Sequence, residues 1–419
     1  MTSSRTQREF QCPGEPAGIS RAVHLARLAD GYPACRECGH RDDAEGLTDR
    51  SRKRIPGPRA RKRPADFLTD EGVWGELHNG FDSTLAGRFA AGFGMLLREE
   101  IGSPGAYPCV AAATDGRAVT QRHFAQIVEQ LRWAGCDVVE LGSVPCPALP
   151  WAMGETEADG GIYLGNPQGD PHRAGMRFYG RGGRPITGIA SLQAVSDRVD
   201  EEPARPVRVS GKAEQAEVLD SYTSRFSECF HGLRPLRFVL HTTCRPVGNC
   251  VERLLSATAC RIVLHESETA VPAGPLPEAA GHFAAAMEDD GQRLRLWDER
   301  GRPVAFESLF LLIAARVYAG ELSGRTVVLG EGTGQVLAAA LEQRGPAVER
   351  CGPLPSEMHA AMVAGRAALG ADRAGRIWYG EAGGSVIADA LATLALVLGR
   401  LSEGDRPLSA VLDAEAARH

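Results

Sequence analysis

The sequence predicts an α/β protein built from three consecutive α/β domains with mixed sheets, preceded by a small module that contains cysteine and histidine. Three observations predict this class. The 419 residues suit about three domains of ordinary size. From about residue 66 onward, one pattern of strand, short loop, amphipathic helix and strand occurs three times. Before residue 66, the chain instead carries a Cys-x-x-Cys pair and a basic stretch interrupted by prolines.

Each of the three copies is expected to form a βαβ unit, in which a helix connects two parallel strands. Apolar residues at positions i, i+3, i+4 and i+7 bury one face of such a helix against a sheet, and short apolar strands flank it. A right-handed crossover is the normal connection. The predicted strand, helix and strand fall at 109–113, 124–131 and 136–141 in the first copy, 237–240, 247–255 and 260–264 in the second, and 326–329, 336–341 and 347–349 in the third.

The composition is typical of a soluble globular protein, with 43% hydrophobic and 24% charged residues. The formal net charge of −6 does not favour a nucleic-acid partner, which would need a basic surface. The longest apolar runs, 310–315 and 390–398, are shorter than the ~20 residues that a membrane helix needs. The first thirty residues lack the apolar core of a signal peptide. We therefore expect a cytoplasmic location, no membrane association, and cysteines that are not paired in disulfides.

Residues 1–48 are predicted to form a zinc-ribbon-like module. Cys35 and Cys38 have the Cys-x-x-Cys spacing that lets two thiolates bind one tetrahedral zinc ion. Cys12 and His24 are the predicted remaining ligands, with His40 as the alternative to His24. A module this short has too little apolar content to fold unaided, and a structural metal would explain how it folds. An iron–sulfur cluster, and reduced thiols or a redox pair, are the alternatives to zinc.

Residues 49–65 are predicted to be a basic, proline-rich linker. Pro56, Pro58 and Pro64 prevent a continuous helix, and the clustered positive charges repel one another. A solvated tether is the simpler interpretation, and binding to a nucleic acid or an acidic surface is the alternative.

Five segments after residue 66 follow one another in the order found in a known family. They are 137–148, with the sequence Asp-Val-Val-Glu-Leu-Gly at its start; 160–162, Gly-Gly-Ile; 175–178, Gly-Met-Arg-Phe; 297–302, Trp-Asp-Glu-Arg-Gly-Arg; and 380–384, Gly-Glu-Ala-Gly-Gly. With these segments the sequence resembles the alpha-D-phosphohexomutase superfamily, the phosphoglucomutases and phosphomannomutases, from near Val73 to near Asp413.

The resemblance implies a domain organisation. Members have a phosphoserine loop in domain I, a magnesium loop in domain II, a sugar-recognition loop in domain III and a phosphate-binding loop in domain IV, arranged around one cleft. It implies that residues 66–205, 206–303 and 304–419 are phosphohexomutase-like domains I, II and III. We expect that domain IV is absent from this chain.

The position of the family's catalytic serine, in its pattern Thr-Ala-Ser-His-Asn-Pro, is occupied by Pro167. The spacing from Gly160 to Phe178 needs no gap against the family pattern, so this position can be read directly. Proline has no hydroxyl group to carry a phosphoryl group, and Gln168 replaces the histidine that follows. The resemblance therefore implies that no intact catalytic residue remains and that phosphoserine chemistry does not occur.

The magnesium loop is also altered. It reads Asp-Gly-Asp-x-Asp-Arg in the family and Glu-Asp-Asp-Gly-Gln-Arg at 288–293 here. Magnesium prefers hard anionic oxygens, and Gln292 is neutral while the phosphoserine ligand is lost. The ligand positions Glu288, Asp290 and Gln292 are therefore interpreted as a vestigial loop, and we expect no magnesium cofactor.

The remaining family loops supply candidate ligand-binding residues. The sugar loop, Gly-Glu-x-Ser-Gly in the family, keeps its glutamate but has a glycine in place of the serine. The family motif Gly-Arg-Asp-x-Arg is kept in part near residue 115, whereas the opening motif Gly-x-x-Gly-x-Arg-Gly is not recognisable within 72–81. On this resemblance the candidates are Asp115, Arg117, Arg293, Gly380, Glu381 and Gly383.

The leading hypothesis is a cytoplasmic, catalytically degenerate phosphohexomutase of bacterial type, which binds a sugar phosphate or acts as a regulatory or scaffold subunit. A protein partner would dock through the N-terminal module. The alternative is an enzyme of carbohydrate metabolism with residual or altered sugar-phosphate chemistry, in the class of intramolecular phosphotransferases. The sequence does not indicate which sugar phosphate is bound or which oligomer forms.

Overall fold

The computed structural model describes residues 10–11, 17–36, 38–52, 55, 62–77, 80–102, 107–166, 172–199, 210–266, 281–318, 322–381 and 384–417. The predicted site residues Cys12, Pro167, Gln168 and Gly383 lie outside these described residues. The chain divides into two compact units, Met1–Arg63 and Pro64–His419.

The described residues of unit 1 form three short helical elements. Its helices are α1 (Arg21–Ala29), the 3-10 turn η1 (Pro33–Arg36) and α2 (Asp49–Arg52). Ser20 caps α1, because its hydroxyl accepts a hydrogen bond from the backbone N–H of Val23. The buried residues of this unit include Phe10, Leu28 and the imidazole of His24, whose ring stacks on Phe10 with 4.2 Å between ring centroids.

Unit 2 begins with an eight-stranded sheet. Its strands are β1 (Leu68–Thr69), β2 (Gly72–Glu76), β3 (Cys109–Thr114), β4 (Asp137–Ser143), β5 (Gly160–Gly165), β6 (Arg173–Gly180), β7 (Arg184–Ile186) and β8 (Ala213–Gln215), in the order β1-β2-β6-β5-β3-β4-β8 with β7 on β6. The helices are η2 (Pro64–Phe67), α3 (Ser83–Ile101), α4 (Ala118–Trp133), α5 (Ala148–Glu155), η4 (Arg181–Gly183) and α6 (Ile189–Asp197). Because β8 pairs with β4, this sheet extends beyond residue 205, the predicted end of domain I.

Two smaller sheets follow. The second, in the order β10-β9-β11-β12, contains β9 (Arg237–Thr242), β10 (Arg261–Glu266), β11 (Phe283–Glu288) and β12 (Arg293–Trp297), with α7 (Leu219–Ser224), α8 (Ser227–Phe230), α9 (Arg245–Leu255) and the turn η5 (Asp289–Gly291). The third, in the order β14-β13-β15-β16-β17, contains β13 (Thr326–Gly330), β14 (Ala347–Cys351), β15 (Leu369–Ala371), β16 (Ile377–Gly380) and β17 (Val386–Ala388), with α10 (Phe306–Val317), α11 (Gln335–Gln343), α12 (Pro355–Gly365), α13 (Ala390–Ser402) and α14 (Leu408–Ala416). The predicted mixed α/β fold with three sheets is therefore confirmed.

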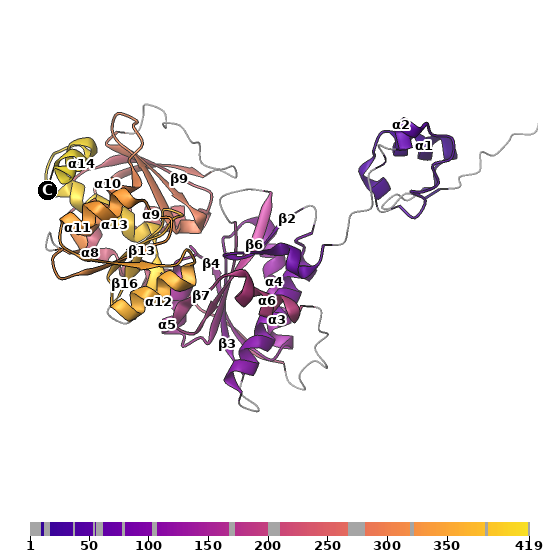
Figure 1. Cartoon of the computed structure of the whole chain (residues 1–419), viewed down its shortest axis with the longest axis horizontal. Helices are drawn as coiled ribbons and strands as arrows, with labels where there is room; N and C mark the ends of the chain where they lie inside the picture. Colours follow the sequence, from indigo (N-terminus) through magenta and orange to yellow (C-terminus); the bar gives the residue numbers. More distant parts are fainter. Residues whose placement is uncertain are drawn as a thin grey trace, which may run out of the picture. The chain divides into compact units, whose positions relative to one another are not determined.

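The three sheets of unit 2, which is drawn in Figure 1, share a core of four strands in the same order. In each sheet the helix of the predicted βαβ unit connects two parallel strands: β3 with β4, β9 with β10, and β13 with β14. A third strand then runs parallel to the first on its other side, and a fourth returns antiparallel to the third: β5 with β6, β11 with β12, and β15 with β16. Each sheet therefore has one hairpin loop in the same topological position.

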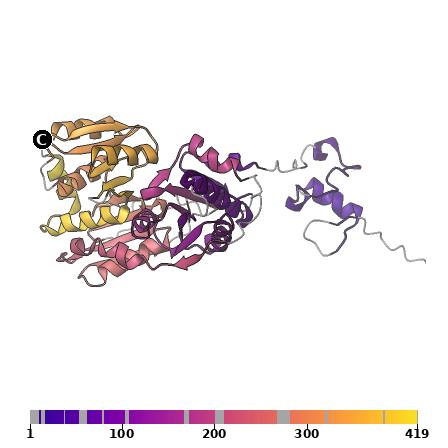
Figure 2. The same cartoon turned by 90° about the horizontal axis from the view of Figure 1, so that it is seen from below.

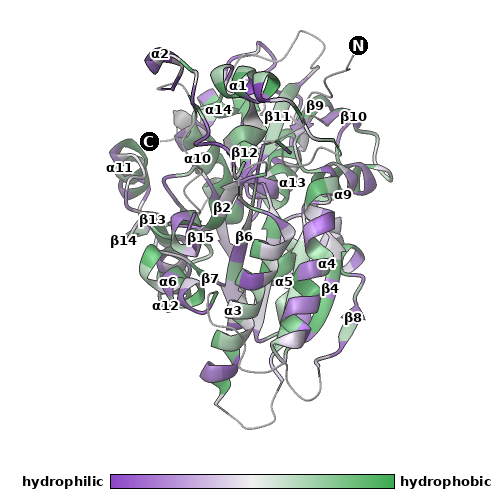
Figure 3. Ribbon diagram, turned by 90° about the vertical axis from the view of Figure 1, so that its right-hand side faces the viewer, coloured by the Kyte–Doolittle hydropathy of each residue, from purple (hydrophilic) through white to green (hydrophobic). Residues whose placement is uncertain are grey.

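Apolar helix faces hold the layers together, as the periodicity predicts. In α4, for example, the residues Ile127, Val128 and Leu131 are buried against the sheet, while hydrophilic residues also occur along the helix (Figure 3). The strongly apolar α13 packs against α8 and α10, so that it lies between the second and third sheets (Figure 2). One continuous apolar core extends from α5 through the second sheet to the third. Among the described residues, every helix is too short or too polar to cross a bilayer.

Candidate functional site

The equivalent hairpin loops of the three sheets meet in one place. They connect β5 to β6, β11 to β12, and β15 to β16. At the first junction, the backbone N–H of Asn166 donates a hydrogen bond to Asp290 Oδ2 at 2.9 Å. At the second, Arg376 Nη1 lies 3.4 Å from Asp289 Oδ2. This convergence defines the candidate site, which we call the three-loop cleft.

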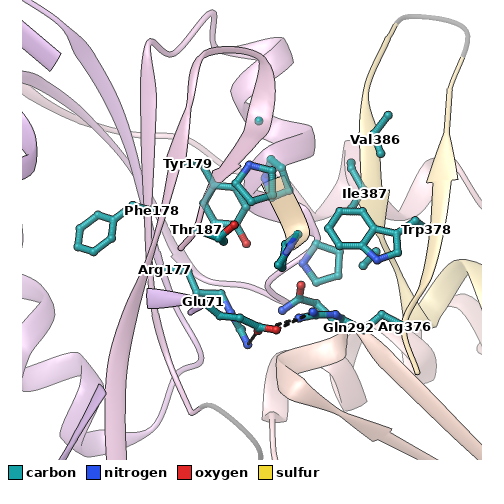
Figure 4. A pocket seen from close by; sticks show the side chains of 16 residues that line it. Glu71, Arg177, Phe178, Tyr179, Thr187, Gln292, Arg376, Trp378, Val386 and Ile387 are labelled. Atoms are coloured by element: carbon teal, nitrogen blue, oxygen red, sulfur yellow. Dashed lines mark hydrogen bonds and ion pairs between the residues drawn. The ribbon is translucent and has the colours of Figure 1, made fainter. Parts of the chain in front are cut away.

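A buried network of ion pairs crosses this cleft and is centred on Arg376. Its guanidinium donates two hydrogen bonds to Glu71, at 2.7 and 2.8 Å, and a third to Asp372 at 2.7 Å. Asp289 contacts both Arg376 and Arg177. Figure 4 shows the carboxylate of Glu71 between the guanidinium groups of Arg177 and Arg376. The network therefore joins residues of the first, second and third sheets.

The charges of the network fix the ionisation of its members. Burial alone lowers the pKa of Arg177, but the surrounding acidic groups, of which Asp289 contributes most, together outweigh burial and hold this pKa well above its usual value. Burial raises the pKa of Asp289, but Arg177 and Arg376 together lower it below the ordinary value for aspartate. The pKa of Asp290 is raised, first by burial and then by the nearby charge of Asp115. Asp289 is therefore the ionised partner of the two arginines.

The open part of the cleft is a cavity of about 570 Å³ with an excess of positive charge. Arg173 has no carboxylate partner among the described residues, and Arg373 has one distant partner, Asp70, at 3.6 Å. Arg293 pairs with Glu288 at 2.7 Å, and its Nε is buried without a described hydrogen-bond partner. The lining residues with charged side chains are Arg173, Arg177, Arg293, Arg373 and Arg376 against Asp70, Glu71 and Asp289. Five guanidinium groups against three carboxylates favour an anionic ligand.

A second, much smaller chamber lies next to the ion pairs (Figure 4). Glu71, Arg177 and Arg376 line both spaces, so the ion pairs form their common wall. The chamber holds about 20 Å³, enough for roughly one water molecule. Its other walls are largely apolar and include Pro147, Pro150, Pro185, Trp378 and Ile387. Of these two spaces, the larger cavity is therefore the one with more room for a ligand.

Asp115 and Arg117 hold the two strand ends that come before and after the segment containing Pro167. Asp115, only 1% exposed, accepts hydrogen bonds from Thr120 and from the backbone N–H and Nε of Arg117. The guanidinium of Arg117 then donates to the carbonyl oxygens of Gly165 at 3.2 Å and Arg173 at 3.0 Å, one on each side of the loop. Of the candidate ligand-binding residues, these two therefore position the loop, and their polar groups are already used within the protein.

The residues of the vestigial magnesium loop do not fit a magnesium ion. Glu288 is engaged by Arg293 and also by Arg295. Asp290 receives the N–H of Asn166, and its carboxyl lies so close to Gly165 that any side chain at position 165 would collide with it. Gln292 turns its amide toward the carbonyl oxygen of Asp289 at 3.3 Å. These three side chains therefore offer no common set of free anionic oxygens, which magnesium requires.

The predicted sugar loop lies on a different hairpin from the cleft loops. Gly380 ends β16, and Glu381 stands in the connection from β16 to β17. The carboxylate of Glu381 accepts a hydrogen bond from Arg225, which also packs on Trp151, Tyr222 and Phe226. Gly380 and Glu381 therefore do not lie on the cleft loop of the third sheet, and this placement is corrected. The hairpin that corresponds to the β5–β6 and β11–β12 loops is Asp372–Arg376, between β15 and β16. Of the five candidate ligand-binding residues that the structure describes, Arg293 is the one that lines the larger cavity.

The sequence contained signals for several cleft residues that were missed. The stretch Ala-Asp-Arg-Ala-Gly at 371–375 matches the family pattern Gly-Glu-x-Ser-Gly in its acidic residue and its last glycine. The internal repeat of three units also identifies this loop, since it follows the third strand of the unit. Gly-Val-Trp-Gly at 72–75 retains the glycines of the family's Gly-x-Arg-Gly, with Trp74 in place of arginine. No comparable signal marked Glu71 or Arg173.

In unit 1, the predicted metal ligands are only partly tested by the structure. His24, Cys35 and Cys38 are buried, and His24 Nε2 has no hydrogen-bond partner among the described residues. His40 is exposed, and its Nδ1 lies 2.9 Å from Asp43. In the part of the chain that the structure describes, no three cysteine, histidine or carboxylate side chains come close enough together to hold a metal ion. The zinc site stays a prediction, since Cys12 is outside the described residues.

Comparisons with known proteins agree with this geometry. The family model described as "Phosphoglucomutase/phosphomannomutase, alpha/beta/alpha domain I" matches residues 67–205. The phosphoglucosamine mutase of Acidothermus cellulolyticus is 26% identical over 375 residues, which cover 83% of this chain and 78% of that protein. The phosphoglucosamine mutase of Thermobifida fusca is 30% identical over 125 residues, 30% of this chain and 27% of that protein.

Solved structures show the same fold. A phosphoglucomutase/phosphomannomutase family protein from Burkholderia thailandensis superposes with a TM-score of 0.71 at 21% identity, covering 84% of this chain and 79% of that one. Parafusin, a phosphoglucomutase of Paramecium, superposes with a TM-score of 0.65 at 14% identity, covering 84% and 74%. The chain belongs to the alpha-D-phosphohexomutase superfamily.

The ion-pair network gives a first testable prediction. Arg376→Met removes a cation that is 3% exposed and leaves Glu71, Asp372 and Asp289 without it, so the folded chain should lose about 3–5 kcal/mol of stability. Arg373→Met, in the same loop but 52% exposed, should change stability by less than ~0.5 kcal/mol. Thermal unfolding of the two variants measures the difference, and equal midpoints would contradict the structural role of Arg376.

Proposed function

We propose that this protein binds a phosphorylated sugar in the three-loop cleft without converting it, as a degenerate member of its superfamily that serves as a binding, regulatory or scaffold subunit. The observation that carries the ligand class is the excess of guanidinium groups in the 570 Å³ cavity. Arginine presents paired N–H donors that match the oxygens of a phosphate group. The sugar part of the ligand is inferred from the relatives, because several of them are named phosphoglucosamine mutases.

The absence of turnover is inferred from the loop between β5 and β6. In the mechanism that the resemblance implies, a serine hydroxyl on this loop carries the phosphoryl group, and Pro167 offers no such oxygen. The two flanks of the loop are held by Arg117, in a hydrogen-bonded arrangement that does not itself need the missing side chains. A retained loop scaffold with a replaced nucleophile supports binding as the remaining activity of the cleft.

Ligand binding is tested by calorimetry with glucosamine 6-phosphate, glucose 1-phosphate and mannose 1-phosphate, and with the unphosphorylated sugars. At least one phosphorylated sugar should bind, and the free sugars should not. The double variant Arg173→Ala/Arg373→Ala should weaken binding by roughly tenfold or more, since each charge-assisted hydrogen bond contributes about 1.5–3 kcal/mol.

Two matched variants serve as controls for this experiment. Arg300→Ala removes an arginine that is 66% exposed and does not line the cavity, and Glu381→Gln alters the predicted sugar loop. Both should bind as the unaltered chain does. If the double variant binds as the unaltered chain does, or if Glu381→Gln loses as much affinity as the double variant, the ligand does not bind in the arginine-lined cavity.

We also propose that unit 1 is a zinc module that docks a protein partner, with Cys35, Cys38, His24 and Cys12 as ligands. The buried positions of the first three residues and the unpartnered Nε2 of His24 support it. The purified chain should contain about one zinc ion by elemental analysis, and Cys35→Ser/Cys38→Ser should remove it. Cys109→Ser, a cysteine of β3, is the control that should keep the zinc. A chain purified without metal would favour the alternative of reduced thiols.

A further inference from the structure

The acidic loop of the cleft, Glu288–Arg293, has all of its ionised charge balanced by arginines of the same chain. Glu288 pairs with Arg293 and Arg295 from β12. Asp289 pairs with Arg177 from β6 and, at 3.4 Å, with Arg376. Each of these carboxylates therefore has two guanidinium neighbours, so a cation from solvent would compete with four positive groups.

Arg177 is the central member of this set, because it faces two consecutive carboxyl groups. Its Nη2 donates a hydrogen bond to Asp289 Oδ1, and its Nη1 lies 3.8 Å from Asp290 Oδ2. Asp289 and Asp290 both have positive φ angles, 54° and 55°, a conformation that residues with side chains seldom adopt. The loop thus presents two acidic side chains in succession to one cation, and that cation is a side chain of the protein.

Because Arg177 is buried, its guanidinium group stays in place beside the two carboxyl groups. The side chain is 6% exposed, and Nη1 also lies 3.7 Å from the sulfur of Cys146. The indole of Trp74 lies against it, with 5.2 Å between the guanidinium carbon and the ring centroid. A guanidinium group does not lose its proton in a protein, so its charge cannot be removed to admit a metal ion. A divalent cation bound to Asp290 would lie within a few ångströms of this charge.

We propose that the guanidinium of Arg177 takes the place of a divalent metal ion in the acidic loop, with Arg376 completing the charge balance, so that the cleft needs no metal. The family implies magnesium at this loop, and the residues of this chain do not fit it. The proposal concerns the loop alone and holds whether or not a sugar phosphate binds in the cavity. In this respect it is separate from the proposed function.

The experiment is a titration of the metal-depleted, full-length chain with Mn²⁺, followed by the electron paramagnetic resonance signal of free Mn²⁺. The unaltered chain should bind no Mn²⁺ at this loop at millimolar concentration. Arg177→Met should gain one Mn²⁺ site, with binding at least tenfold tighter than in the unaltered chain, and adding Asp290→Asn should remove that site.

Two further variants serve as controls. Arg177→Lys keeps the positive charge and should gain no Mn²⁺ site. Arg173→Met, which removes a cavity arginine away from the two carboxyl groups, is the matched control and should also gain none.

Two results of the titration would overturn the proposal. The first is that the unaltered chain binds one Mn²⁺ ion and that Asp290→Asn abolishes this binding. The second is that Arg177→Met folds but gains no Mn²⁺ site. Because Arg177→Met leaves buried carboxylates uncompensated and could unfold the chain, the melting temperature of the unaltered chain is measured in parallel. Mg²⁺ should leave it unchanged, and a rise that Asp290→Asn abolishes would contradict the proposal.

Discussion

The arrangement of the cleft loops depends on the ion pairs that the buried guanidinium of Arg376 makes. It pairs with Glu71, which lies 305 positions earlier in the chain, with Asp289 of the second sheet and with Asp372 of its own loop. A buried charge is stable only while its partners stay in place, and removing one partner leaves the others uncompensated. Three sheets that otherwise repeat one topology are thereby fixed around a common point, with the hydrogen bonds between Thr187 and Ser356 as a second link between the first and third.

The chemistry of the cleft follows from how its charges are distributed. Arg177 and Arg376 are committed to carboxylates inside the protein, whereas Arg173 and Arg373 reach the cavity with little or no internal compensation. The first pair maintains the acidic loop, and the second pair provides attraction for a ligand. This division explains how one site can combine an acidic loop from its superfamily with an excess of positive charge. It also separates the arginines that are paired within the protein from those that are proposed to bind a ligand, although all four lie in the same cleft.

The three βαβ units could be predicted because helix burial leaves a periodic pattern that needs only local residues, as at Ile127, Val128 and Leu131. The cleft was harder to predict, because its loops have no periodicity. The pattern around Glu381 resembled the sugar loop more closely than Ala371–Gly375 did, yet Glu381 is held by Arg225 on another hairpin. The pairing of Glu71 with Arg376 depends on sheet packing across most of the chain, and a single sequence contains no signal for it. Arg293, which was singled out from its resemblance to the family's magnesium-loop motif, lines the cavity, and its role in ligand binding stays a prediction.

The proposed function requires that the cleft bind a phosphorylated sugar without transferring its phosphoryl group. Phosphorus NMR of the purified chain with glucosamine 6-phosphate, the corresponding 1,6-bisphosphate and Mg²⁺ tests this most directly, because substrate and product isomers give separate resonances. The substrate resonance should shift or broaden on binding, and no 1-phosphate resonance should grow with time. A growing 1-phosphate resonance that disappears when residues 167–170 are replaced by alanine would contradict the account and show that the loop still catalyses transfer.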